Sequence, residues 1–204
     1  MRITSLRQVT AEHVTVVFED ATELKSTLGV VTELRLFAGR ELDEHDYDIL
    51  NRESRRALAR EKALELVSQR QMSAKELNRK LRDKGADEDT ADYCVRWITE
   101  RGLIDEERYA GAIVRHYAAK GYGEGRIRQE LARRGVPREL WEDALTEMPE
   151  GTSKLDRLVA SKLRDPDDRD AVRKLSAALY RRGFSGEEIR GALERAKASF
   201  GYEE

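Results

Sequence analysis

One short pattern occurs three times along this 204-residue chain, and it constrains the fold more than any other feature. The pattern is a pair of apolar residues four positions apart, followed four residues later by glycine. The three copies are Leu77-Leu81-Gly85, Ile127-Leu131-Gly135 and Leu175-Leu179-Gly183. Residues four apart lie on one face of an α-helix, and glycine commonly follows a helix C-terminus. Each copy therefore predicts a helix with one buried face that ends at its glycine.

A second apolar stripe follows each glycine. Apolar or small residues recur one, six, nine and ten positions after it, which predicts a helix that begins just beyond the glycine. Suitable start signals are Asp87, Pro137 and the Ser185–Glu188 capping box. A further helical segment precedes each anchor pair, at residues 57–69, 106–118 and 154–163. Each copy is thus a three-helix module that must stack on its neighbours to bury its apolar faces.

The first 52 residues differ from the repeats. Residues 14–18 are β-branched and aromatic, and the chain can turn at residues 19–22 into a second short strand near Leu24. This pattern predicts a β-hairpin, which must pack on another element because an isolated hairpin is only marginally stable. Helical spacing follows, at Val30, Leu34 and Phe37 before Gly39, and at Tyr47 and Leu50 after a capping Asp43.

Together these patterns predict a mainly α-helical fold. Three tandem three-helix modules form an elongated, curved body of nine main helices, preceded by a small N-terminal extension of β-hairpin and short helices. The expected bounds are residues 1–52 for the extension, then 53–103, 104–150 and 151–204 for modules one, two and three.

Composition and residue spacing argue against several classes of function. Charged residues make up 38% of the chain but nearly cancel, to a formal net charge of −2, so any nucleic-acid binding depends on local basic clusters. The three histidines are isolated, and Cys94 falls where modules two and three have alanine. We therefore expect no catalytic centre, no metal site and no cofactor. Without a secretory leader or an apolar run of membrane-spanning length, we expect a cytoplasmic protein.

Several segments of the repeats resemble the RecX family of regulatory proteins. They are Ser73–Gly85 in module one, Arg101–Ala110 at the junction with module two, Lys120–Gly135 in module two and Tyr180–Phe184 in module three. The resemblance implies a protein without catalytic activity or cofactor that binds the RecA recombinase, lies along its nucleoprotein filament and opposes filament growth or strand exchange. It therefore implies a role in regulating homologous recombination, DNA repair and the SOS response.

Basic residues near two of the repeated glycines are the candidate contacts with RecA or DNA. They are Arg126, Arg128, Arg133 and Arg134 in module two, and Arg173, Lys174, Arg181 and Arg182 in module three, with Tyr122 as an exposed contact in the Gly121–Gly125 loop. Their charges suit acidic protein surfaces or the phosphates of single- or double-stranded DNA. The alternative is that basic residues ahead of a terminal glycine only complement the helix dipole and stay solvated.

Two other functions are compatible with a chain of this kind. One is a stand-alone helical DNA-binding protein, such as a helix-turn-helix regulator; the nearly neutral charge argues against it, because duplex-binding proteins usually carry a strongly basic face. The other is a helical-repeat scaffold with a different partner, against which the motif resemblance argues. We expect the protein to be a monomer that acts by binding its protein partner, and we expect no membrane binding.

Overall fold

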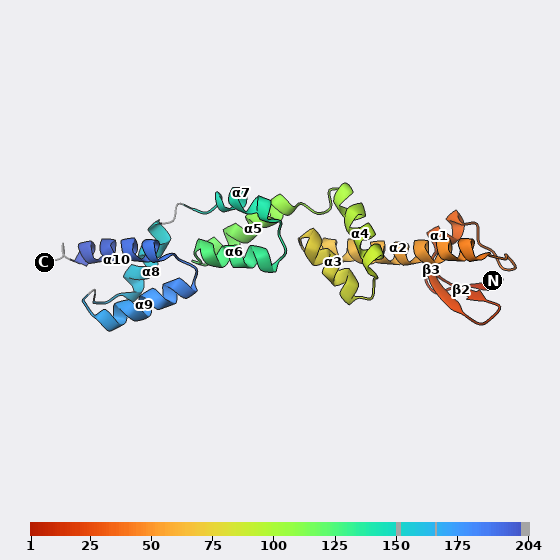
Figure 1. Cartoon of the computed structure of the whole chain (residues 1–204), viewed down its shortest axis with the longest axis horizontal. Helices are drawn as coiled ribbons and strands as arrows, with labels where there is room; N and C mark the ends of the chain where they lie inside the picture. Colours follow the sequence, from red (N-terminus) through yellow and green to blue (C-terminus); the bar gives the residue numbers. More distant parts are fainter. Residues whose placement is uncertain (150–151, 166, 201–204) are drawn as a thin grey trace. The chain divides into compact units, whose positions relative to one another are not determined.

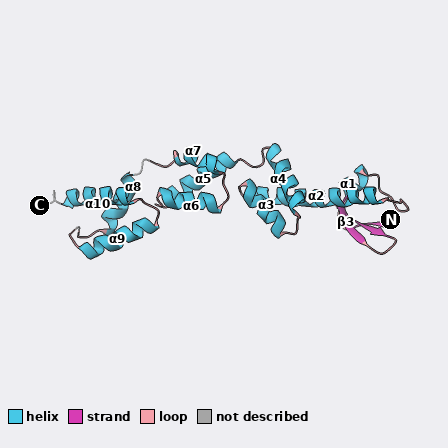
Figure 2. Cartoon of the chain, viewed as in Figure 1, coloured by secondary structure: helices cyan, strands magenta, loops and turns pink. Residues whose placement is uncertain are grey.

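Within the residues that the structure describes, the strands lie at the beginning of the chain and helices joined by loops follow them (Figure 2). The computed structural model describes residues 1–149, 152–165 and 167–200. Two compact units, Met1–Ile104 and Asp105–Glu204, divide the chain. The elements of the first unit are β1 Ile3–Gln8, β2 His13–Phe18, β3 Glu23–Thr27, α1 Leu28–Glu33, α2 Glu44–Gln69, α3 Ala74–Asp83 and α4 Glu88–Glu100 (Figure 1).

The N-terminal extension contains one strand more than the predicted hairpin. Its sheet is antiparallel in the order β1-β2-β3, with Val16 opposite both Leu6 of β1 and Leu24 of β3. Strand β1 lacks a recognisable pattern because Ile3 is its only fully buried residue. The first predicted helix is shorter than expected, because α1 ends at Glu33 and does not continue to Phe37. Phe37, which was expected on the apolar face of that helix, is 60% exposed, and Leu36 is buried instead.

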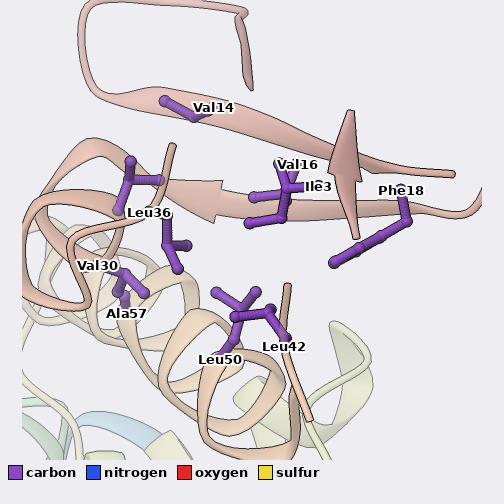
Figure 3. Packing of buried hydrophobic residues seen from close by; sticks show 10 residues of the cluster. Ile3, Val14, Val16, Phe18, Val30, Leu36, Leu42, Leu50 and Ala57 are labelled. Carbon is purple, nitrogen blue, oxygen red and sulfur yellow. The ribbon is translucent and has the colours of Figure 1, made fainter. Parts of the chain in front are cut away.

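Helix α2 joins the extension to the first module. It begins where predicted, with the Asp43 side chain accepting a hydrogen bond from the Asp46 backbone N–H, but it continues for 26 residues, through the boundary expected at residue 52. Figure 3 shows apolar side chains of the sheet facing Leu50 and Ala57 of this helix. The sheet and the first module therefore share one helix, which supplies the packing surface that an isolated sheet would lack.

The core of module one lies between α2, α3 and α4. The anchor residues Leu77 and Leu81 are at most 1% exposed and pack with Cys94 and Ile98 of α4. Burial raises the pKa of the Cys94 thiol to about 11, so the group stays protonated at neutral pH. Cys94 is thus a small core residue, as its alignment with alanine in the other repeats predicts.

Modules two and three make up the second unit. Its elements are α5 Glu106–Ala119, α6 Glu124–Arg133, the short 3₁₀ helix η1 Arg138–Leu140, α7 Trp141–Leu145, α8 Thr152–Lys162, α9 Arg169–Arg181 and α10 Gly186–Phe200 (Figure 1). Ile127 and Leu131 anchor the core of module two, and Leu179 packs in that of module three. The predicted boundary at residues 150 and 151 lies outside the described residues.

The three repeated glycines all have a left-handed backbone, with φ of +95° at Gly85, +72° at Gly135 and +89° at Gly183. Glycine adopts this conformation at little cost, so each ends its helix as predicted. The capping box of the last helix is also confirmed: the Ser185 N–H donates to Glu188 Oε2 at 2.6 Å, and the Glu188 N–H donates to Ser185 Oγ at 3.2 Å. The three-helix repeat is therefore present as the sequence predicts.

Glycines also join module two to module three. The Gly123 N–H donates to the Arg182 carbonyl at 2.9 Å, and the Gly125 N–H donates to the Gly183 carbonyl at 3.0 Å. The first turn of α6 is thus capped by the carbonyls that end α9, which satisfies N–H groups that no side chain caps. A Cβ atom on Gly123 would lie 2.5 Å from the Gly183 oxygen. We call Gly123, Gly125 and Gly183 the glycine interlock.

Candidate partner-binding surface

Three candidate arginines of module two converge on one buried carboxylate. The Glu130 side chain is only 4% exposed, and it accepts from Arg133 at 2.7 Å and from Arg126 at 3.1 Å, while Arg134 lies 3.9 Å away. The three arginines stand three or four positions from Glu130, a spacing that places side chains on the same face of a helix. Arg126 and Arg133 are therefore engaged within α6, whereas Arg134, the C-cap of that helix, also donates to the Tyr109 hydroxyl of α5 at 3.0 Å.

The pKa of Glu130 shows the balance of forces in this cluster. Burial alone would raise the pKa, but hydrogen bonds from Arg133 and Tyr117 and the charges of Arg133 and Arg126 outweigh it, so the pKa lies below its ordinary value. Glu130 is consequently ionised at neutral pH. The cluster is a structural ion network that stabilises α6 against its neighbours.

Arg128, the fourth candidate of module two, is also engaged. Its guanidinium donates two hydrogen bonds to Glu142 of α7, at 2.8 and 2.9 Å, and a third to Glu124 at 2.6 Å. Hydrogen bonds to Glu142 and then Glu124 raise its pKa above the ordinary value. The structure therefore brings the module-two residues together mainly with acidic partners of their own module.

Module three lacks the acidic centre of that network. Glu130 stands five residues before Gly135, and the residue five before Gly183 is Ala178. Arg181, the counterpart of Arg133, and Lys174 form no ion pair among the residues that the structure describes. Arg173 pairs with Asp170 at 3.1 Å, but both side chains are about three-quarters exposed, so the pair is weak. These cations are available to a partner.

The available cations share one face of α9 with an exposed aromatic ring. At 3.6 residues per turn, Arg173, Lys174, Tyr180 and Arg181 fall within roughly a third of the helix circumference, opposite the buried Leu175 and Leu179. Tyr180 is 71% exposed, more than any other large apolar side chain in the described part of the chain. We call these four residues the basic face of α9. Tyrosine and arginine, three of these four residues, are enriched where proteins bind partners.

Sequence reasoning did not single out the exposed Tyr180, and it expected Tyr122 to be exposed, which the structure does not show. Tyr122 is half-buried, with its ring 5.5 Å from that of Tyr117, and the Arg182 guanidinium lies 5.9 Å from its centroid. Arg182 and Tyr122 therefore belong to the contact between modules two and three. Tyr180 was detectable, because the equivalent residues, Arg82 and Ala132, are polar or small at a position that faces solvent.

Other kinds of site are not found within the described residues. Across 1–149, 152–165 and 167–200, no group of three or more His, Cys, Asp or Glu side chains is placed to hold a metal ion. No helix in that part of the chain is both long and apolar enough to cross a membrane. The fold and this surface define a class of protein, a tandem three-helix-repeat protein with an exposed basic and aromatic face.

Family models match each module in turn. RecX first, second and third three-helix domains match residues 59–96, 105–145 and 154–193. The chain belongs to the RecX family. The regulatory protein RecX of Xanthomonas axonopodis pv. citri is 38% identical over 135 residues, or 65% of this chain and 83% of that protein. The regulatory protein RecX of Vibrio parahaemolyticus is 33% identical over 139 residues, or 66% and 89%.

Solved structures show the same fold. A crystal structure of regulatory protein RecX superposes with a TM-score of 0.73 at 22% identity, covering 95% of this chain and 98% of the other. That of RecX from Lactobacillus salivarius gives 0.62 at 22% identity, covering 71% and 97%. The relatives are regulatory proteins, in a family not known for enzymes, so the chain is a RecX-family regulator.

Proposed function

We propose that this chain binds the RecA recombinase filament and reduces its ATPase, its extension and its recombination activity during DNA repair. Membership of the RecX family carries the proposal. The chain would act in the cytoplasm as a monomer, without catalysis or cofactor. Several modules in tandem suit a filament, because a binder that contacts adjacent protomers gains avidity from individually weak contacts.

The basic face of α9, which joins the candidates Arg173, Lys174 and Arg181 to Tyr180, is the surface best suited to the contact. Arg173, Lys174 and Arg181 are exposed and free of buried acidic partners, and Tyr180 supplies a rigid ring among them. Acidic filament surfaces or DNA phosphates would satisfy these charges. Arg126, Arg128, Arg133 and Arg134 would contribute less, because a partner would first have to displace their internal carboxylates.

The proposed activity is tested by measuring RecA ATP hydrolysis on single-stranded DNA with sub-stoichiometric amounts of the chain. We expect the steady-state rate to fall, because one bound chain affects more than one RecA protomer. An unchanged rate over the full range of ratios would refute inhibition.

The proposed site is tested in the same assay by reversing three charges of the basic face, Arg173→Glu, Lys174→Glu and Arg181→Glu. We expect the concentration for half-inhibition to rise about tenfold or more, since attraction becomes repulsion. The matched control reverses Lys75, Arg79 and Arg82, three exposed cations of α3 in module one. Equal losses in the two variants would show that only net charge matters and would remove the basic face as the site.

A further inference from the structure

A row of planar side chains alternates between arginine and aromatic residues in module one. Arg56 and Arg60 belong to α2, Tyr93 and Trp97 belong to α4, and Arg101 is the residue that caps the C-terminus of α4. The Arg56 guanidinium carbon lies 4.2 Å from the centroid of Tyr93, that of Arg60 lies 6.0 Å from Tyr93 and 5.7 Å from Trp97, and that of Arg101 lies 4.0 Å from Trp97. We call these five residues the arginine–aromatic row.

Helical spacing assembles this row at the edge of the core. Two residues four apart on α2 meet Tyr93 and Trp97, which are four apart on α4, and Arg101 follows four positions later at the C-cap. The side chains therefore follow the line along which the two helices pack. Tyr93 and Trp97 are half-buried, whereas Cys94 and Ile98 on the same helix are fully buried. The row therefore faces solvent along one side.

Two cations of the row have no carboxylate partner among the described residues. Arg60 donates only to the Tyr93 hydroxyl, at 3.5 Å, and Arg101 donates only to the Trp97 carbonyl, at 3.2 Å. Arg56, in contrast, pairs with Glu53 at 3.1 Å. Two positive charges stacked on aromatic rings thus remain without an internal counter-ion.

We propose that the arginine–aromatic row binds single-stranded nucleic acid. Unpaired bases stack on aromatic rings and on guanidinium planes, and the phosphates between them attract the cations. A duplex would not serve equally well, because its bases are already stacked on one another inside the helix. The proposal does not depend on RecA binding or on the basic face of α9, and it places a strand contact in the first module.

The competing interpretation is that the row only holds α4 against α2. Cation–π contacts can stabilise a fold without any ligand, so geometry alone does not separate the two roles. The two interpretations differ in a measurable way. A ligand that stacks on the row must change the fluorescence of Trp97, and a purely structural contact responds to no nucleic acid.

The chain has two tryptophans, so each can be observed alone. In a Trp141→Phe background, a short oligothymidylate added without RecA should quench Trp97, with an affinity that falls as salt rises. In the reciprocal Trp97→Phe background, Trp141 should stay unchanged, because it is partly buried in module two and its Nε1 donates to the Val136 carbonyl at 3.0 Å. The absence of Trp97 quenching would overturn the proposal without the need for a site variant.

A second test of the proposal removes positive charge from the arginine–aromatic row. Arg60→Gln with Arg101→Gln should weaken oligothymidylate binding about tenfold by fluorescence anisotropy of a labelled strand. The control is Lys75→Gln with Arg79→Gln, which removes the same charge from the exposed surface of α3. Circular dichroism checks that both variants keep their helices. Equal affinities of the two variants would overturn the proposal, and preferential binding of an acidic protein over the strand would do the same.

Discussion

Replacing Gly183 with alanine tests the contact between modules two and three. Gly183 has φ of +89°, and a Cβ atom there would lie 2.2 Å from the Arg126 nitrogen and 2.7 Å from its Cβ. The left-handed backbone alone costs a non-glycine residue about 1–2 kcal/mol. The clash must also separate α6 from α9 and break the two hydrogen bonds of the glycine interlock, each worth about 1 kcal/mol net. We therefore expect a loss of roughly 3–4 kcal/mol in the free energy of unfolding.

The matched control for this substitution is Gly85→Ala. Gly85 has nearly the same φ, +95°, but a Cβ atom there meets nothing within 4 Å. It should lose only the backbone cost of about 1–2 kcal/mol. Urea unfolding followed by Trp141 reports on the second unit, and Trp97 reports on the first. A loss at Gly183 no larger than that at Gly85 would refute the interlock.

Three further predictions concern the helical modules. Leu131→Ala should cost about 2–5 kcal/mol in urea unfolding, because the side chain is fully buried and a cavity remains; a loss below about 1 kcal/mol would contradict that burial. Glu130→Gln should cost roughly 1–3 kcal/mol at neutral pH, after allowing for its solvent-exposed arginine partners. Because the folded state lowers the pKa of Glu130, its contribution is present above the unfolded pKa and is lost as pH falls through the folded value. Thermal unfolding should therefore show less acid destabilisation for the glutamine variant than for the wild type, and parallel pH profiles would argue against the network. Cys94 should react slowly with a thiol reagent at neutral pH, since burial raises its pKa to about 11, and rapid labelling of the native protein would contradict this.

Local signals made most of the helical fold predictable from the sequence. The side chains of Asp43 and Asp87 cap the helices that they were expected to start, and Ser73 and Asp105 cap α3 and α5 in the same way. Gly85, Gly135 and Gly183 end helices with left-handed backbones because that conformation strongly favours glycine. Repetition added certainty, since one ambiguous apolar pair becomes informative when it recurs three times with the same glycine.

Local sequence signals did not predict features that depend on pairing between distant parts of the chain. Strand β1 is mostly exposed and pairs with β2 through its backbone, so its side chains carry no alternating pattern. The network around Glu130 was missed because basic residues were judged by their position before a glycine, without the acidic residue one turn earlier. The comparison with Ala178 shows that the same residues hold a clear signal once the modules are aligned.

The N-terminal extension and the arginine–aromatic row also depend on tertiary contacts that the sequence did not predict. His13 of β2 lies 2.8 Å from Glu61 of α2, and Ser54 donates to Ser26 at 2.8 Å, contacts between residues far apart in sequence. Arg60 and Trp97 likewise come together only when α2 packs on α4. Periodicity predicts each helix, but it does not predict which side chains meet across two of them.

The central claim, that this RecX-family chain binds RecA filaments, is tested most directly by a binding measurement. RecA assembled with a non-hydrolysable nucleotide on immobilised single-stranded DNA is compared with the same strand left bare, and binding of the chain is followed by surface plasmon resonance. We predict saturable binding to the RecA-coated strand, tighter than to the bare strand at the same salt concentration. Binding to the bare strand that RecA coating abolishes, or no binding to either, would contradict the claim.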